Sequence, residues 1–235
     1  MGLCIHSNTK KRKTTSKTTS KTTSKNAKKT IKKYSNHDKS ICLNSSVPLY
    51  DNSVVFQYYS KSKDNELPGM GAGEKIKRCD VSKYEQLSAI PNWRKMLSNF
   101  WEPPGKDTNK ALFSLGGHNW RTVQHYLQGI KYMKENPKYY REFSLDSGSV
   151  FSKNPLLAKK MYKDIPPDTQ FKMHEEAERE KALYAKYSQN IYLKNMLLNT
   201  LNAKLVHFRR GKPPLVSYEL MRVRQKLRKE FCKNN

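Results

Sequence analysis

Three polar side chains in the middle of the chain, Gln124, Gln128 and Lys131, recur at intervals of four and three residues. On a helix, this spacing places two amides and an ammonium group in one row along the same face. The ammonium group suits a phosphate as a mobile point charge. Such a row either faces a ligand or is a solvated helix surface, and the spacing is compatible with both.

A helix over residues 120–131 is the element that must position this row. Apolar residues recur at helical spacing beside it: Val123, Tyr126, Leu127, Ile130 and Met133. This pattern predicts an amphipathic helix with one buried face, and Thr122 can cap its N-terminus. Just upstream, residues 113–120 are expected to form a short hairpin that turns at Gly116 and Gly117.

The elements around this helix are also indicated by pattern. Alternation from Val54 to Tyr58 predicts a strand with at least one buried face. Residues 172–199 have the spacing of one long helix or two shorter ones, and residues 205–208 can return as a strand. A final basic amphipathic helix is predicted from about Val216.

Two segments of this central region resemble the NADAR family, also called YbiA-like. Its members carry Leu-Ser-Asn-Phe and then Trp, a few residues, and Glu-His-Tyr-x-Gln-x-x-Lys. The matching residues here are Asn99, Trp120, His125, Tyr126, Gln128 and Lys131. The family glutamate is not matched, because Gln124 stands at that position.

Two further blocks resemble the same family, so the similarity spans about Phe56 to Arg228. Residues 59–62 read Tyr-Ser-Lys-Ser and are followed by a glycine-rich stretch that ends at Glu74. The resemblance implies that this stretch is a substrate-facing loop. Residues 185–190 and 197–200 are similar to Lys-Phe-x-Gln-Asn followed by Leu-Leu-x-Thr.

The resemblance implies an α+β fold, a predominantly helical single domain with a few short strands. It also implies an N-glycosidase, which hydrolyses the N-glycosidic bond of phosphoribosylated or ADP-ribosylated compounds. The substrates implied are riboflavin-pathway phosphoribosylamino-pyrimidines or ADP-ribosyl-guanine. Such cleavage passes through an oxocarbenium-like state, and it needs a carboxylate and groups that bind the anionic end.

The substrate-binding residues implied are Asn99, Trp120, Gln128 and Lys131. Asn99 offers an amide to sugar hydroxyls or a base edge, or else caps the turn at Phe100. Trp120 stacks on the base, or else belongs to the core. Lys131 binds the phosphate end, or else is a surface lysine.

The sequence does not identify the catalytic carboxylate, because the amide of Gln124 has the shape of glutamate but cannot exchange a proton at neutral pH. Glu74 and Asp168 are the carboxylates expected to compensate. The alternative is a catalytically weakened protein that binds ADP-ribose or phosphoribosyl ligands. His125 is expected to be structural, since no metal-ligand spacing surrounds it.

Residues 1–45 are predicted to be a disordered basic tail, and residues 54–232 the domain. The tail holds twelve Lys or Arg against the single acid Asp38, and Lys-Thr-Thr-Ser occurs three times in succession from Lys13. Repeats without apolar residues cannot offset the entropy of folding. The net charge of +26 favours polyanions: nucleic acid, an acidic membrane or phosphorylated small molecules. A nucleic-acid tether explains this charge but not the domain.

The four cysteines, Cys4, Cys42, Cys79 and Cys232, are far apart and show no paired spacing. The sequence therefore predicts neither a zinc site nor a disulfide scaffold, and a reducing, intracellular (cytoplasmic) location. No metal and no cofactor are expected. No apolar run approaches membrane-spanning length.

Membrane association through lipidation is a separate hypothesis for the first four residues. Gly2 can carry myristate and Cys4 palmitate, and the basic run over residues 10–33 can hold acidic headgroups. The alternative is an unmodified start, since the usual Ser or Thr at the sixth position is His6.

If the lipidation hypothesis holds, Gly2→Ala moves the protein from the membrane fraction to the cytosolic fraction. An unchanged cytosolic distribution of both forms would end it.

Overall fold

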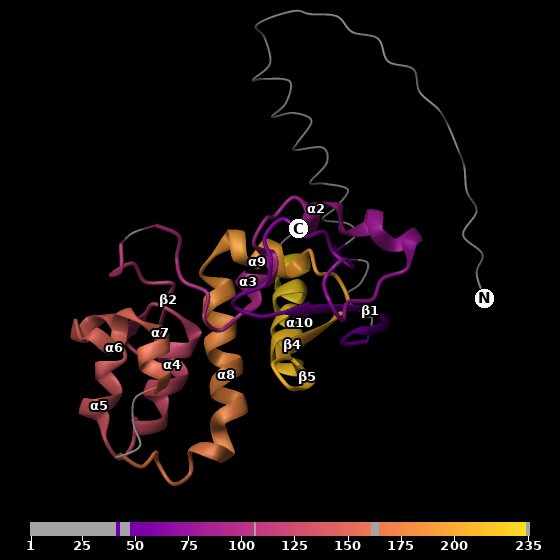
Figure 1. The fold of residues 1–235 in the computed structure, drawn as a ribbon. Helices are drawn as coiled ribbons and strands as arrows, with labels where there is room; N and C mark the ends of the chain where they lie inside the picture. The colour runs from indigo at the N-terminus through magenta and orange to yellow at the C-terminus, as the bar shows by residue number, and fades with distance from the viewer. Residues whose placement is uncertain (1–40, 43–47, 106, 161–164, 234–235) are drawn as a thin grey trace, which may run out of the picture.

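The computed structural model describes residues 41–42, 48–105, 107–160 and 165–233. Most of the predicted tail, residues 1–40 and 43–45, lies outside the described residues, as does the lipidation site at Gly2 and Cys4. The described chain is mainly helical with two small sheets (Figure 1). This arrangement confirms the predicted α+β class.

The larger sheet joins two ends of the chain. It consists of β1 (Asp51–Tyr58), β4 (Ala203–Arg209) and β5 (Lys212–Val216) in the order β1-β4-β5, with β1 parallel to β4 and β5 antiparallel to it. In β1, the side chains of Val54, Phe56 and Tyr58 are buried, as the alternation predicted. Strand β5 contains two prolines, which the edge position tolerates.

Helices make up most of the rest of the described chain. They are η1 (Arg78–Tyr84), α2 (Glu85–Ser88), α3 (Trp93–Leu97), α4 (Val123–Gly129), η2 (Ile130–Tyr132), α5 (Pro137–Glu142), η3 (Leu145–Ser147), α6 (Val150–Lys153), α7 (Pro155–Lys160), α8 (Phe171–Ser188), α9 (Ile191–Leu198) and α10 (Tyr218–Lys233). Helices α8 and α10 are the longest of them. The second sheet is the predicted hairpin of β2 (Phe113–Leu115) and β3 (His118–Trp120). Gly116 and Gly117 form its turn with φ of 62° and 77°, a region that favours glycine.

Helix α4 is shorter than the predicted helix because Trp120 ends strand β3. It begins after Thr122, whose hydroxyl oxygen accepts a hydrogen bond from the His125 amide at 3.2 Å. This is the predicted cap. The 3₁₀ helix η2 follows directly and contains Lys131.

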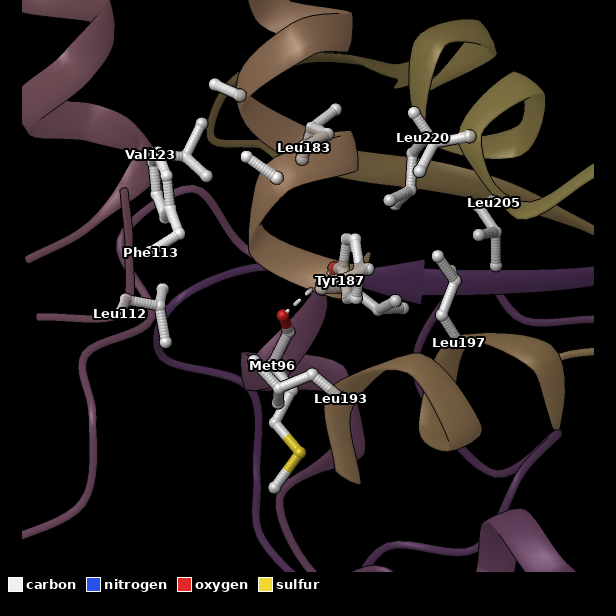
Figure 2. Packing of buried hydrophobic residues seen from close by; sticks show 14 of the residues in the cluster. Met96, Leu112, Phe113, Val123, Leu183, Tyr187, Leu193, Leu197, Leu205 and Leu220 are labelled. Carbon is white, nitrogen blue, oxygen red and sulfur yellow. Dashed lines mark hydrogen bonds between the residues drawn. The ribbon is translucent and has the colours of Figure 1, made fainter. Parts of the chain in front are cut away.

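The long helix α8 lies between two groups of elements, with α4 to α7 on one side and the larger sheet with α10 on the other (Figure 1). Figure 2 shows Leu183 and Tyr187 of α8 in the core, between Val123 and Leu220. The Tyr187 hydroxyl donates to the Met96 carbonyl at 3.2 Å. Helix α8 is therefore the element against which both groups pack.

A disulfide joins Cys42, ahead of β1, to Cys232 near the end of α10. This corrects the expectation that the cysteines form no disulfide. The two residues are 190 positions apart, so no local spacing could indicate the bond. Ile41 is also only 4% exposed, so residues 41 and 42 belong with the domain and not with the predicted tail.

The disulfide should stabilise the domain because it closes a long loop. We expect Cys42→Ala/Cys232→Ala to lower the free energy of unfolding by about 2–4 kcal/mol, measured by urea denaturation without reductant. Dithiothreitol should lower the stability of the wild type by a similar amount and leave the double variant unchanged. Cys79→Ala is the matched control, because Cys79 is free and exposed. Equal stability of all three proteins would contradict the crosslink.

Candidate functional site

A cavity of about 230 Å³ is formed by residues of α4, α7, α8, α10, the larger sheet and the loop after α3. Leu183 and Leu220, both labelled in Figure 2, contribute apolar lining. The polar lining groups belong to Tyr58, Ser98, Asn99, Gln124, Lys159, Arg179, His207, Ser217 and Glu219. Two of the predicted site residues, Asn99 and Gln124, are therefore brought together here.

Asn99 and Gln124 form one wall of the cavity. The Gln124 backbone amide donates to the Asn99 carbonyl at 2.9 Å, so the first turn of α4 holds the loop that carries Asn99. The Gln124 side chain is only 8% exposed, and its amide makes no hydrogen bond with any residue that the structure describes. The amide therefore faces the cavity, where it can donate to or accept from a ligand hydroxyl or carbonyl.

The loop that carries Asn99 is also held by Lys186 of α8. Its ammonium group is completely buried and donates to the carbonyl oxygens of Met96 at 2.6 Å and Ser98 at 2.9 Å. Burial lowers the pKa of Lys186 to about 7. Lys186 thus positions the residues immediately before Asn99.

Arg179 and Glu219 form a second wall. Arg179 Nε lies 3.5 Å from Glu219 Oε1, and Arg179 Nη2 donates to Glu175 Oε1 at 2.6 Å. Arg179 Nε is buried and makes no hydrogen bond within the described part of the chain. Glu219 is in the first turn of α10, where the helix dipole favours a carboxylate.

The remaining charges make the cavity suitable for an anion. Lys159 lines it, with its ammonium group 5.7 Å from the centre of the Phe100 ring. Burial lowers the pKa of His207, and the nearby Arg209, Arg179 and Lys159 lower it further, which favours a neutral imidazole. Two cationic side chains and one carboxylate therefore line the cavity, among the residues that the structure describes.

Trp120 lies outside the cavity, although it was expected to stack on a base. Its side chain has no exposed surface, its indole Nε1 donates to the Leu115 carbonyl at 2.9 Å, and its ring packs edge-on against Tyr126 at 5.2 Å. The Trp120 side chain therefore belongs to the core, which was the alternative to stacking on a base. The sequence could not distinguish stacking on a base from burial in the core, since a Trp side chain suits both places and a buried indole needs only one acceptor for its N–H.

Gln128 and Lys131 do not line the cavity either. The Lys131 ammonium donates to Gln128 Oε1 at 2.9 Å, so the two side chains are paired with each other. Burial lowers the pKa of Lys131, an effect opposed by Glu175 and reinforced by Arg179. Lys131 is thus close enough to Arg179 for their charges to interact, beside the cavity wall.

Glu74 is completely buried in an ion pair and does not line the cavity. Its carboxylate accepts hydrogen bonds from Arg94 Nε at 2.8 Å and Nη2 at 2.7 Å, and from the amides of Gln57, Gly69 and Gly71. Five donors leave no lone pair directed at a substrate. The carboxylate holds the glycine-rich loop in place and lies away from this cavity, so the catalytic role expected for Glu74 has no support here.

Asp168 is likewise engaged by backbone amides. Its carboxylate accepts from Lys134 N at 2.9 Å and from Glu135 N at 3.1 Å, and it lies outside the cavity lining. It therefore holds the chain after η2 against the start of α8, away from this cavity, so the catalytic role expected for Asp168 has no support here.

His125 is a core residue rather than a metal ligand. His125 is buried with Nδ1 2.8 Å from Thr122 Oγ1, and burial followed by the charge of Arg121 lowers its pKa to about 3. Within the described ranges, no group of His, Cys, Asp and Glu side chains is arranged to hold a metal ion. No helix in the same ranges is long and apolar enough to cross a membrane.

No family model matches the chain, and no curated protein matches it. Among solved structures, the chain is similar to the NMR structure of the Escherichia coli protein YbiA, with a TM-score of 0.46 and 19% identity. The match covers 81% of this chain and 92% of that one. A likeness of this strength assigns neither a family nor an activity, so the function is argued from the cavity.

Four residues that line the cavity were not predicted from the sequence: Lys159, Arg179, His207 and Glu219. Their only signal was position: Glu219 directly precedes the inward-facing Leu220, and Arg179 is one turn before Leu183. Such signals do not separate a cavity-lining charge from a solvated one, because both stand at the margin of an apolar stripe.

The buried Lys186 should make stability depend on pH. Its pKa is about 7 in the folded protein and 10.5 in the unfolded chain, so the unfolded state binds more protons between these values. The free energy of unfolding should therefore rise with pH across this window, by at most about 1.4 kcal/mol per unit from this group. Lys186→Met should flatten the slope between pH 7 and 9 in urea denaturation, whereas the exposed Lys172→Met should retain it. An unaltered slope in Lys186→Met would exclude the effect.

Proposed function

We propose that the cavity binds the phosphorylated ribose of a small molecule and that the protein hydrolyses its N-glycosidic bond. The observation that carries the proposal is the side-chain amide of Gln124 beside Asn99, in the lining of a cavity that also contains the cationic groups of Arg179 and Lys159. Amides suit sugar hydroxyls, and guanidinium and ammonium groups suit phosphate. The cavity thus combines groups for both parts of a ribose phosphate.

The size of the cavity favours the smaller of the two substrate classes. Pockets for drug-sized ligands have volumes of about 300–1,000 Å³, and this one has about 230 Å³. A ribose phosphate is compatible with that volume, while a second nucleotide portion would extend outside. We therefore favour phosphoribosylamino-pyrimidines over ADP-ribosyl-guanine as the substrate.

The reaction type rests on the resemblance to NADAR sequences. Replacement of a base or amine by water at the anomeric carbon passes through an oxocarbenium-like state, which needs a carboxylate to stabilise charge or activate water. Gln124 occupies the family glutamate position and cannot serve. This observation favours a second candidate function, a protein that binds ADP-ribose or phosphoribosyl ligands without turnover.

Both functions require ligand binding in the cavity, which calorimetry with ribose 5-phosphate and ADP-ribose can measure. Arg179→Met should weaken ribose 5-phosphate binding by about 10- to 100-fold, as expected for losing a charge-assisted hydrogen bond. Affinity should fall as salt rises, because part of it is electrostatic. Lys131→Ala tests the residue that the sequence favoured, and we expect a smaller loss because Lys131 lies beside the cavity.

Thermal unfolding of each variant verifies that the folded state is retained. A wild-type protein that binds neither compound at millimolar concentration would overturn the proposal. Equal losses of affinity for ribose 5-phosphate in Arg179→Met and Lys131→Ala would instead indicate that the phosphate binds close to Lys131.

A further inference from the structure

We propose that Glu219 is the carboxylate that activates water in this cavity, in the role that Gln124 cannot fill. The inference rests on the proposed function, since it assigns a residue to that reaction. Glu219 is the single carboxylate among the described residues that line the cavity. It comes from α10, whereas Gln124 comes from α4.

The other candidate carboxylates are engaged elsewhere. Glu74 is saturated by five donors, and Asp168 holds two backbone amides. Glu175 contacts Arg179 but does not line the cavity, and Glu178 accepts from the Tyr126 hydroxyl at 2.5 Å and pairs with Lys181. Among the residues that the structure describes, Glu219 alone combines access to the cavity with the absence of a strong internal partner.

The contact between Glu219 and Arg179 suits this role. At 3.5 Å, the Arg179 Nε to Glu219 Oε1 contact is an ion pair without a hydrogen bond. The carboxylate is thus oriented by the guanidinium while its lone pairs remain available to a water molecule. The Glu219 side chain is 20% exposed, so water can reach it.

Glu219 and Gln124 line the cavity from α10 and α4, two helices that pack on different sides of α8 (Figure 1). The buried amide of Gln124 and the side chain of Asn99 would hold the sugar from the α4 side, which leaves the anomeric carbon between them and α10. A water bound by Glu219 would then approach from the α10 side. Carboxylate function is in this way relocated across the cavity, from α4 to α10.

The step balances with water as the second reactant. The water oxygen forms a bond to the anomeric carbon while one of its protons passes to the Glu219 carboxylate. The bond from the anomeric carbon to nitrogen breaks, and its electron pair leaves with the base or amine. The departing nitrogen takes up a proton from solvent water and Glu219 returns its proton to the solvent, so the products are the free sugar phosphate and the neutral base or amine, and Glu219 is again ionised.

The test compares turnover and binding in matched variants of the full chain. A phosphoribosylamino-pyrimidine is the substrate, release of the free base is followed by mass spectrometry, and ribose 5-phosphate is the calorimetric probe. Glu219→Gln should lower kcat by about 10²- to 10⁴-fold, the usual size of a general acid-base contribution. Its affinity for ribose 5-phosphate should be unchanged or higher, since a negative charge is removed.

Glu175→Gln is the matched control, because it also removes a carboxylate from Arg179 but not from the cavity. It should retain most of the turnover. If Glu219→Gln loses binding as well as turnover, Gln124→Glu/Glu219→Gln decides: recovery of ten-fold or more supports a carboxylate requirement, and no recovery overturns the inference. Gln124→Glu alone should give no gain, because two carboxylates facing one small cavity resist ionising together.

The results separate this inference from the proposed function. Turnover by both the wild type and Glu219→Gln overturns the role of Glu219 and leaves the N-glycosidase proposal standing. A wild type that binds ribose 5-phosphate without turning over any phosphoribosylated substrate also overturns that role, and leaves the binding function. A wild type that neither binds nor turns over overturns the proposed function itself.

Discussion

The buried ammonium group of Lys186 ties helix α8 to the loop that carries Asn99. Its hydrogen bonds to the carbonyls of Met96 and Ser98 compensate for its removal from water, and the Tyr187 hydroxyl adds a third contact to the same segment. A buried cation with such partners admits few alternative arrangements. The loop is therefore placed by α8. Its Asn99 carbonyl in turn accepts a hydrogen bond from the Gln124 amide in the first turn of α4.

Helix α8 also determines where the cavity lies. Its Arg179 and Leu183 face the space between α4 and α10, which pack on different sides of it (Figure 1). The walls contribute different chemistry: amides from α4 and the loop after α3, an ammonium group from α7, and a paired carboxylate and guanidinium from α8 and α10. Because the walls come from distant parts of the chain, the composition of the site follows from packing rather than from any single motif.

Much of the fold could be predicted from local pattern. The capped helix after Thr122, the hairpin at Gly116 and Gly117, and strand β1 all follow from signals within about ten residues. The candidate site was predicted only in part, through Asn99 and Gln124. Glu74 and Asp168 were placed among the catalytic groups because a sequence shows that a carboxylate is present but not how many backbone amides surround it.

The sequence by itself determined the fold class, the helical periodicity and the absence of a carboxylate at position 124. Tertiary structure decided which polar groups meet. It buried Trp120 in the core, saturated Glu74 with donors and brought Glu219 into the cavity from a helix nearly one hundred residues after Gln124. It also joined Cys42 to Cys232. The physical reason is that periodicity depends on neighbours along the chain, whereas hydrogen-bond saturation, burial and disulfide pairing depend on neighbours in space.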